Sequence, residues 1–331
     1  MRQGTAATVA GAQRPTAGRI LFVCGSLNQT KQMQQIAAHL PEYDCVFTPY
    51  YGDRALTHCR ERGLLEFTIM GRKMRRIALA YLQAEGLAID IDGASDAHDF
   101  AVTCTDLVVP DNVRNRPLVL VQEGMMDPLN LGYHLVRRLP SLPRWLASTA
   151  ATGLSHAYQR FCVASEGFVD LFAARGVERG RMVVTGMPNF DHCEAYLKGR
   201  FLFRDYVLVC TTDMRETCRY DDRQAFLRQA LDIAAGRPLV CKLHPNENVR
   251  RATAEIRALA PRARIFHRGS AEHMVAHCSE LITQYSSLAF VGMALGKPVH
   301  SCFADRTLRA LMPVQNGGRS AAHIAAVCRG V

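Results

Sequence analysis

The chain has 331 residues, of which 48% are hydrophobic and 21% are charged, and its formal net charge is +10 at pH 7. This composition excludes general disorder, and no apolar run approaches the roughly 20 residues that a membrane-spanning helix needs. The length suits two domains of about 150 residues each.

The predicted elements of the first half alternate between strands and helices. Strands are predicted over 19–24, 44–48, 117–122, 161–164 and 182–185. A further strand is predicted within 100–109, and residues 87–92 are a candidate short strand. Helices are predicted over 31–40, 63–86 and 166–175. A strand, a polar turn and a helix open a Rossmann-like half, but the turn after Cys24 is not GxGxxG, so the dinucleotide fingerprint is missing.

The alternation restarts after a boundary near residues 197–205. Strands are predicted over 206–210, 238–243, 263–267, 281–282 and from 299, and helices over 221–235, 250–259, 271–277 and 320–329. We therefore expect an α/β fold with two Rossmann-like domains that face each other across a cleft. The expected divisions are a flexible tail (1–17), an N-terminal domain (18–197), a C-terminal domain (198–315) and a C-terminal helix (316–331).

Two serines mark the start of a predicted helix within the stretch 281–300, which reads LITQYSSLAFVGMALGKPVH. Free backbone N–H groups and the helix dipole favour an anion at such a position. We interpret Ser286 and Ser287 as part of a phosphate site, and simple capping of the helix is the alternative.

Two basic residues close the predicted strand at 238–243. Lys242 and His244 alternate onto one side of that strand and could face the same anion. A structural histidine and a lysine paired with a carboxylate are the alternatives. Thr212 and Arg215 follow the first strand of the second half and are further candidate contacts, unless they belong to a solvated loop.

A carboxylate follows the strongly apolar strand at 117–122. Open parallel sheets keep their ligand chemistry at the carboxyl ends of their strands, so Glu123 is a candidate general base, with a bond to the backbone as the alternative. Gly25, Ser26, Asn28 and Gly124 are candidates for an acceptor side, or else for tight turns. Asp127, before a proline, is predicted to be a turn residue.

The net charge indicates which kinds of partner the protein binds, and the cysteines indicate the cellular compartment. The basic residues are dispersed without interleaved surface aromatics, so we predict no nucleic-acid partner, and a nucleotide sugar or a membrane surface fits the charge equally well. The 12 cysteines include no CxxC pair and many lie in apolar runs, which favours free thiols in the cytoplasm, with the inner membrane face as an alternative.

The segment RRLPSLPRW combines arginines with Trp145, the one tryptophan of the sequence. It could contact an anionic lipid or a lipid-linked acceptor, although we favour a helix pair packed on the sheet. No cluster of His, Cys and Asp has metal-ligand spacing. We therefore expect no metal site and no cofactor, with basic groups and helix N-termini stabilising a leaving phosphate.

Three motifs carry a resemblance to a known superfamily. The run from Val163 to Asp191 resembles the segment before the interdomain hinge of GT-B glycosyltransferases and of non-hydrolysing UDP-N-acetylglucosamine 2-epimerases. The segments KLHP (242–245) and TQYSS (283–287) resemble later motifs, nearest to CDP-glycerol glycerophosphotransferases and bacterial capsule-sugar transferases. The resemblance covers residues 160–320 and, more weakly, 19–40.

Departures from these motifs bear on the reaction. The epimerases carry acidic residues in the helix after the serine turn and a basic residue in the first turn. Here those places hold Phe290-Val291 and Leu27-Asn28, which argues against epimerisation. The glycerophosphate transferases show His-Gly where this chain has Glu123-Gly124, and a carboxylate can also accept a hydroxyl proton.

The resemblance implies a GT-B glycosyltransferase, or a glycerophosphate-type transferase, of cell-surface polysaccharide or glycoconjugate synthesis. Its donor would be a nucleotide sugar and its acceptor a carbohydrate or lipid-linked molecule. One alternative is a sugar-nucleotide 2-epimerase. The other is a non-catalytic protein that binds anions, membranes or nucleic acid.

Overall fold

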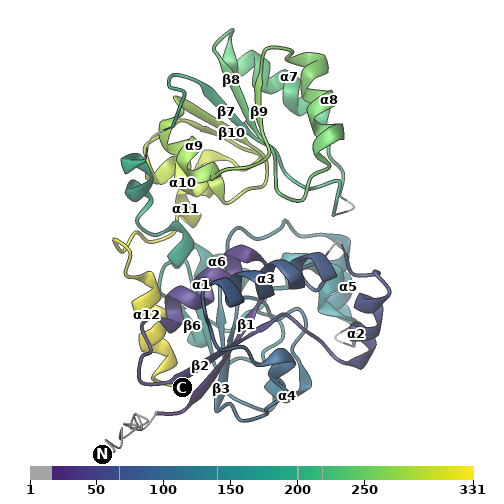
Figure 1. Cartoon of the computed structure of the whole chain (residues 1–331), viewed down its shortest axis with the longest axis vertical. Helices are drawn as coiled ribbons and strands as arrows, with labels where there is room; N and C mark the ends of the chain where they lie inside the picture. Colours follow the sequence, from purple (N-terminus) through teal and green to yellow (C-terminus); the bar gives the residue numbers. More distant parts are fainter. Residues whose placement is uncertain (1–16, 67, 140, 200, 218) are drawn as a thin grey trace, which may run out of the picture.

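The computed structural model describes residues 17–331 apart from residues 67, 140, 200 and 218. Two α/β domains lie one above the other along the long axis of the molecule, and each contains a parallel sheet flanked by helices (Figure 1). The predicted α/β class with two Rossmann-like domains is confirmed. The predicted tail at 1–17 falls almost entirely outside the described residues.

The first sheet is fully parallel and has the order β2-β1-β3-β4-β5-β6. Its strands are β1 (Arg19–Cys24), β2 (Asp44–Pro49), β3 (Phe100–Thr103), β4 (Leu118–Val121), β5 (Arg160–Val163) and β6 (Met182–Val184). Its helices are α1 (Leu27–Ala37), α2 (Arg54–Glu61), α3 (Arg72–Ala84), α4 (Asp111–Arg114), α5 (Leu131–Arg138) and α6 (Glu166–Ala174). Short 3-10 turns are η1 (Ile91–Gly93), η2 (Arg144–Ala151), η3 (Arg179–Arg181), η4 (Pro188–Phe190) and η5 (Cys193–Lys198).

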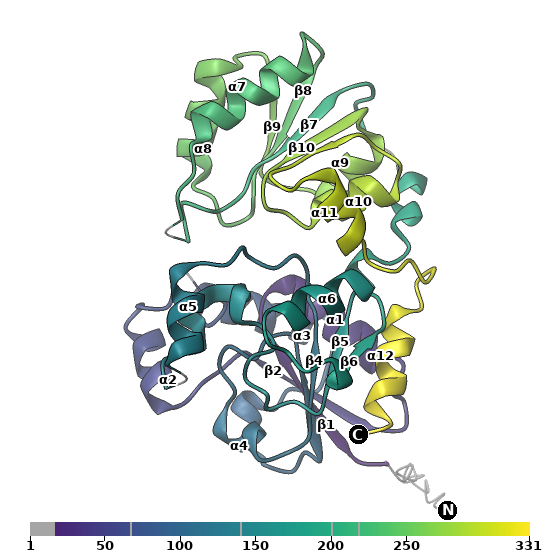
Figure 2. The ribbon, with the colours of Figure 1, turned by 180° about the vertical axis from the view of Figure 1, so that it is seen from behind.

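The second sheet is also parallel and has the order β11-β10-β7-β8-β9. Its strands are β7 (Val207–Cys210), β8 (Leu239–Lys242), β9 (Arg264–Phe266), β10 (Glu280–Thr283) and β11 (Val299–His300). Its helices are α7 (Arg223–Ala234), α8 (Val249–Leu259), α9 (Ala271–His277), α10 (Leu288–Ala294) and α11 (Asp305–Leu311). The last helix, α12 (Ser320–Cys328), lies beside the first domain in both views (Figures 1 and 2).

The central strands are buried on both faces, as their continuous apolar runs predict. All four residues of β4 and all four of β7 are buried, because helices cover both faces of each sheet. Within the described part of the chain, no helix has the length and hydropathy of a membrane span.

Three predicted elements of the first half are corrected. Helix α1 begins at Leu27 rather than at residue 31, because Ser26 and Gln29 form a capping box. Residues 87–92 contribute only an isolated bridge between Ile89 and Phe47, and not a strand. The helical segment expected at 63–86 is helical only over α3, from Arg72 to Ala84.

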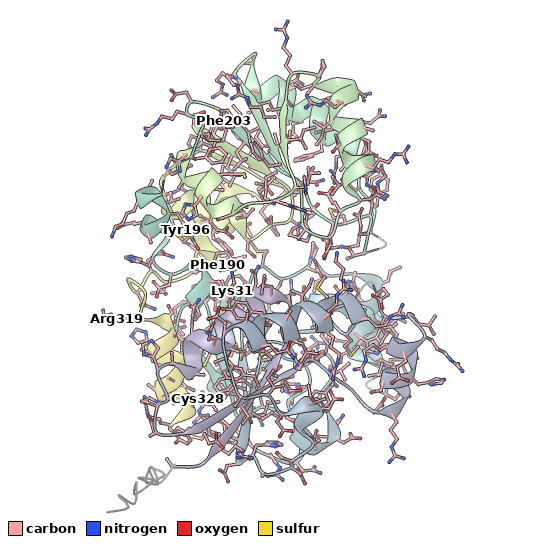
Figure 3. All side chains as sticks on the ribbon, in the orientation of Figure 1. Lys31, Phe190, Tyr196, Phe203, Arg319 and Cys328 are labelled. Carbon is pink, nitrogen blue, oxygen red and sulfur yellow. The ribbon has the colours of Figure 1, made fainter. Side chains whose placement is uncertain are left out.

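An apolar junction joins the two domains. Phe290 of α10 is fully buried and contacts the rings of Phe168 in α6 and Phe190 in η4. Phe190 lies between the two domains in Figure 3. Phe290 and Val291 therefore fill the core and do not line a binding surface, so the position where the epimerases carry acids is structural in this chain.

Candidate functional site

The strand orders place a topological switch point in each sheet. It lies between β1 and β3 in the first sheet and between β7 and β10 in the second. Open α/β sheets bind ligands outside the carboxyl ends of the strands at such points. A ligand-binding site is therefore expected at the loops after β1, β4, β7, β8 and β10.

Glu123 follows β4 and faces the first turn of α1. Ser26 Oγ donates a hydrogen bond of 2.9 Å to Glu123 Oε1, and Gln29 Nε2 donates to Glu123 Oε2. The same two residues form the capping box, so the turn that starts α1 also fixes the carboxylate. Burial raises the pKa of the Glu123 carboxyl, and the hydrogen bonds from Gln29 and Ser26 oppose that shift.

The loop after β4 contacts the loop after β10. The backbone N–H of Met125 donates to Ser287 Oγ at 2.8 Å, although 162 positions separate the two residues. A Cβ atom on Gly124 would lie 2.6 Å from the same Oγ, so only glycine allows this approach. The carboxyl ends of the two sheets thus meet at Ser287, one loop away from Glu123.

Ser286 and Ser287 lie at the start of α10, as the sequence predicts. Ser286 Oγ accepts the N–H of Leu288 at 3.3 Å, which is a local turn contact just before the N-cap residue Ser287. Ser287 Oγ accepts from Met125 and retains its hydroxyl proton for a further acceptor.

His244 stands just beyond β8 with its side chain 37% exposed. The N–H of Asn246 donates to His244 Nδ1 at 3.3 Å, which leaves the ring proton on Nε2. Burial lowers the pKa of His244 despite the nearby Asp213 carboxylate. The ring is therefore a neutral hydrogen-bond donor near pH 7.

A buried polar network supports the loops around His244. Glu247 Oε2 accepts the His244 N–H at 2.8 Å, and Arg223 Nη1 lies 2.8 Å from Glu247 Oε1. Arg223 also donates to the carbonyl of Thr212 at 3.1 Å. Thr212 Oγ1 donates to Gln284 Oε1 at 2.9 Å. The network ties the ends of β7, β8 and β10 together.

The structure does not bring every predicted residue to this place. Lys242 is buried, and its Nζ donates to the Leu243 carbonyl at 2.9 Å. Arg215 makes two hydrogen bonds of 2.7 Å with the carboxylate of Glu255. Its guanidinium is therefore engaged away from His244, and Thr212 acts as a bridge to Gln284 rather than as an open contact.

On the acceptor side, Gly25 and Gly124 are tight-packing positions and Ser26 holds Glu123. A Cβ atom on Gly25 would overlap the Gln29 side chain. Asn28 is exposed, and its carbonyl accepts from Asn189 Nδ2 at 3.2 Å. The glycines thus serve close packing, which agrees with the alternative interpretation of tight turns.

Sequence reasoning missed an ion pair between the two domains. Arg219, in the loop after β7, donates to Asp127 Oδ1 at 2.5 Å. Ser148 Oγ donates to the other oxygen of Asp127 at 2.6 Å, and Arg175 donates to its carbonyl at 3.0 Å. Asp127 is therefore more than a turn residue. The sequence around Asp127 does not predict its ion-pair partner, because that partner is 92 positions away.

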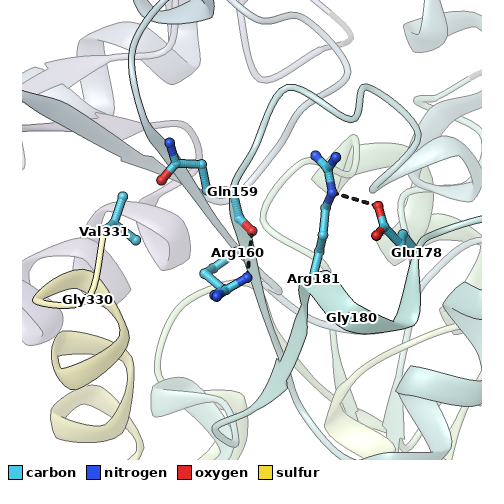
Figure 4. Close-up of a pocket in the computed structure, with 7 residues that line it drawn as sticks. All are labelled: Gln159, Arg160, Glu178, Gly180, Arg181, Gly330 and Val331. Carbon is cyan, nitrogen blue, oxygen red and sulfur yellow. Dashed lines mark hydrogen bonds and ion pairs between the residues drawn. The ribbon is translucent and has the colours of Figure 1, made fainter.

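A pocket of about 460 Å³ opens in the first domain, at the amino ends of strands β5 and β6. Figure 4 shows the residues that line it. The pocket is lined by residues at the amino ends of β5 and β6 and at the end of the chain: Gln159, Arg160, Glu178, Gly180, Arg181, Gly330 and Val331. This position is remote from the carboxyl ends of the strands, so the pocket is separate from the site. Among the described residues, no group of three or more His, Cys, Asp or Glu side chains could hold a metal ion.

No protein-family model and no curated protein sequence matches the chain. Solved structures do match over nearly its whole length. UDP-GlcNAc 2-epimerase from Neisseria meningitidis, bound to UDP-GlcNAc, has 10% identity and a TM-score of 0.58, covering 95% of this chain and 100% of that one.

Two further structures are similar to the chain. Anabaena Alr3699/HepE, in complex with UDP and glucose, has 11% identity and a TM-score of 0.52, covering 94% of this chain and 90% of that one. The wall teichoic acid polymerase TagF with CDPG has 11% identity and a TM-score of 0.52, covering 95% of this chain and 88% of that one. At such identities the likeness concerns the fold: the chain has the GT-B fold, which it shares with these epimerases and with TagF.

Proposed function

We propose that the chain is an enzyme that transfers a glycosyl unit, or a related phospho-alditol, from a nucleotide donor to a hydroxyl acceptor. The observation that carries the proposal is the meeting of the loops after β4 and β10. The loop that begins with Glu123, a carboxyl of raised pKa, thereby contacts Ser287, whose hydroxyl suits an anionic donor. Such a pairing of a base with donors for a leaving phosphate fits group transfer.

The donor side of the proposed site belongs to the second domain. His244 Nε2, beyond β8, and the hydroxyl of Ser287, beyond β10, can donate to diphosphate oxygens, and Ser286 precedes Ser287 in the same turn. The neutral state of His244 makes this recognition one of hydrogen bonds rather than of charge. The ligands of the similar structures, UDP-GlcNAc, UDP and CDPG, make UDP- and CDP-activated donors the first to test.

The proposed reaction starts with an acceptor hydroxyl that approaches from the first domain. Glu123 accepts the hydroxyl proton as the oxygen forms its new bond to the donor's reactive centre, an anomeric carbon or a phosphorus. For a glycosyl donor, the bond from the anomeric carbon to the diphosphate breaks and a nucleoside diphosphate leaves. For a phospho-alditol donor, the bond between the two phosphates breaks and a nucleoside monophosphate leaves.

The likeness to TagF, a wall teichoic acid polymerase, supports an acceptor from a cell-surface polymer or glycoconjugate. We therefore propose that the enzyme acts in cell-surface polysaccharide or glycoconjugate synthesis.

A sugar-nucleotide 2-epimerase is the second candidate. The match to the Neisseria enzyme covers all of that chain, so the whole fold of an epimerase is available here. Its proposed chemistry would need no acceptor, and Glu123 would remove a proton from the sugar instead.

Incubation of the protein with UDP-GlcNAc alone separates the two candidates. The transferase proposal predicts no 2-epimer by NMR, and release of nucleotide from UDP- or CDP-activated donors that rises when hydroxyl acceptors are added. Formation of the 2-epimer without any acceptor would remove the transferase proposal.

A further inference from the structure

The outer face of α5 is apolar although no described element covers it. Of the 15 large hydrophobic side chains exposed in the described part of the chain, six lie between positions 129 and 146. They are Leu129 (50% exposed), Leu131 (82%), Leu135 (51%), Leu139 (52%), Trp145 (39%) and Leu146 (46%). This concentration in one short segment exceeds the scattered apolar exposure of an ordinary protein surface.

Three of these side chains share one side of α5, and the other three belong to the segments next to it. Leu131, Leu135 and Leu139 recur every four positions, which puts them on one side of the helix. A Cβ atom on Gly132 would lie 2.3 Å from the carbonyl oxygen of Leu146, so the start of α5 packs directly on η2. We call Leu129, Leu131, Leu135, Leu139, Trp145 and Leu146 the α5 outer face.

The opposite side of α5 already has its partner. Tyr133 and Val136 are buried in a small core with alanines of η2. The leucines on the outer side of α5 have no such partner among the described elements, and they remain exposed beside Arg138. In the views of Figures 1 and 2, α5 lies at the periphery of the first domain, on the side away from α12.

The segment that carries this face contains basic residues and no acidic ones. No Asp or Glu occurs between Pro128 and Gln159, whereas this stretch contains Arg137, Arg138 and Arg144. Within the described ranges, none of these arginines forms an ion pair: Arg137 donates to the Arg175 carbonyl and Arg144 to the Asp106 carbonyl. Asp127, just before the stretch, is already paired with Arg219.

We propose that the α5 outer face is a membrane-docking surface that binds an anionic lipid bilayer. Leucines and a tryptophan beside arginines, without acids, match the interface of such a bilayer, where apolar side chains enter the acyl boundary and cations meet the headgroups. A protein partner of ordinary composition would also bring lysines and arginines to this surface, and the segment has no carboxylate to pair with them.

The face begins close to the candidate site. The loop that starts with Glu123 continues through Asp127, which bridges to Arg219 of the second domain, and reaches Leu129. A docked molecule would hold the junction of the two domains near the membrane. The docking inference itself does not depend on the proposed transfer, and its failure would leave that proposal standing.

Trp145 supplies an internal reporter, because the sequence contains one tryptophan. The full chain is mixed with vesicles of phosphatidylcholine alone or of phosphatidylcholine with phosphatidylglycerol, at low and at high salt. We expect co-flotation with the anionic vesicles, a blue shift of the Trp145 emission, and quenching by brominated lipid. High salt weakens the binding.

Matched variants locate the contact. Leu131→Ser with Leu135→Ser should lower the partition coefficient about tenfold or more, since two apolar side chains lose their burial. The control, Leu64→Ser with Leu202→Ser, alters side chains that are 60% and 89% exposed elsewhere and should bind like the wild type. Arg138→Glu should weaken binding to anionic vesicles, whereas Arg76→Glu on α3 should not.

Three results would overturn the proposal. One is the absence of binding to anionic vesicles. Another is binding that leaves Trp145 unquenched and is unaffected by Leu131→Ser with Leu135→Ser. The third is a concentration-dependent dimer in sedimentation velocity that this double variant abolishes, which would assign the face to a second copy of the chain.

Discussion

The protonation state of the Glu123 carboxyl depends on a balance between burial and two neutral hydrogen-bond donors. Burial disfavours the carboxylate and raises the pKa of Glu123, while Gln29 and Ser26 stabilise the charged form. No described cation forms an ion pair with it, and the two hydrogen bonds offset only part of the effect of burial. A carboxyl with a raised pKa is a stronger base than an exposed one, which suits the proposed proton transfer.

Replacing Glu123 by Gln should lower turnover about tenfold or more and leave nucleotide affinity nearly unchanged. The wild-type kcat/KM should fall as the pH drops through the raised pKa of Glu123, at a pH above that of an ordinary glutamate. This acidic limb should vanish in Glu123→Gln. Near-normal turnover, or an unchanged acidic limb, would remove Glu123 from the mechanism.

The same raised pKa makes a prediction about stability. Between the unfolded and the folded pKa of Glu123, the native state binds more protons than the unfolded state, so its stability falls as the pH rises through that interval. Glu123→Gln removes this loss. The Tm of the variant relative to the wild type should therefore rise from acidic to neutral pH, and a constant difference would contradict the inferred burial effect.

For single residues, the sequence predicts where a side chain lies in the fold better than it predicts which neighbours the side chain bonds. Glu123 at the end of a central strand and Ser287 at a helix start are both where the pattern places them, and the structure brings their loops together. Lys242 and Arg215 also lie at or after strand ends, yet Lys242 donates to the Leu243 carbonyl and Arg215 donates to the Glu255 carboxylate. A pattern of strand ends says which residues lie near an edge, and not which neighbours occupy their donors.

The approach of the β4–α5 loop to α10 depends on the missing side chain at Gly124. A Cβ atom there would lie 2.6 Å from Ser287 Oγ. Gly124→Ala should therefore push the loop from α10 and lower the free energy of unfolding by about 1–3 kcal/mol, with a loss of turnover.

A double-mutant cycle in urea tests this cause. Ser287→Ala removes the clashing oxygen, so Gly124→Ala with Ser287→Ala should be less destabilised than the sum of the single variants. Strictly additive effects would show that the two residues do not interact.

The elements themselves are largely predictable from apolar runs and caps. The strand expected within 100–109 forms and ends at Thr103, whose Oγ1 donates to the Thr105 carbonyl in the turn that follows. No strand forms at 87–92, where Asp90 accepts from Ser95 in a turn. Hydrophobic pattern locates an element, whereas local side-chain bonds fix where it ends.

Over the described part of the molecule, several polar contacts besides Met125–Ser287 join segments that are far apart in the sequence. Asp127 pairs with Arg219 across the two domains at one such contact, and Asp191 accepts the N–H groups of Asn316 and Ser320 at a second. The second holds the return of the chain to α12 beside the first domain. The sequence predicts both halves and the final helix, but not this return, because its contacts join residues more than 120 positions apart.

The Asp127–Arg219 pair should hold the two domains close while contributing little stability, because it is partly exposed. Arg219→Ala should change the free energy of unfolding by less than about 1 kcal/mol and increase the radius of gyration in small-angle X-ray scattering. High salt should shift the wild type in the same direction. Arg228→Ala on α7 is the control, and an unchanged radius for Arg219→Ala would show that the pair does not restrain the domains.

Nucleotide binding at the carboxyl end of the second sheet is the central claim. The most direct test measures the thermal shift of the wild type, of His244→Ala, and of Ser286→Ala with Ser287→Ala, across UDP, CDP, CMP and GDP, with His39→Ala as the control. At saturation, about 100 times the Kd, one nucleotide should stabilise the wild type and the control by about 2.7 kcal/mol. Both site variants should lose most of that shift. No shift with any nucleotide, or an equal shift in all variants, would contradict the proposed donor site.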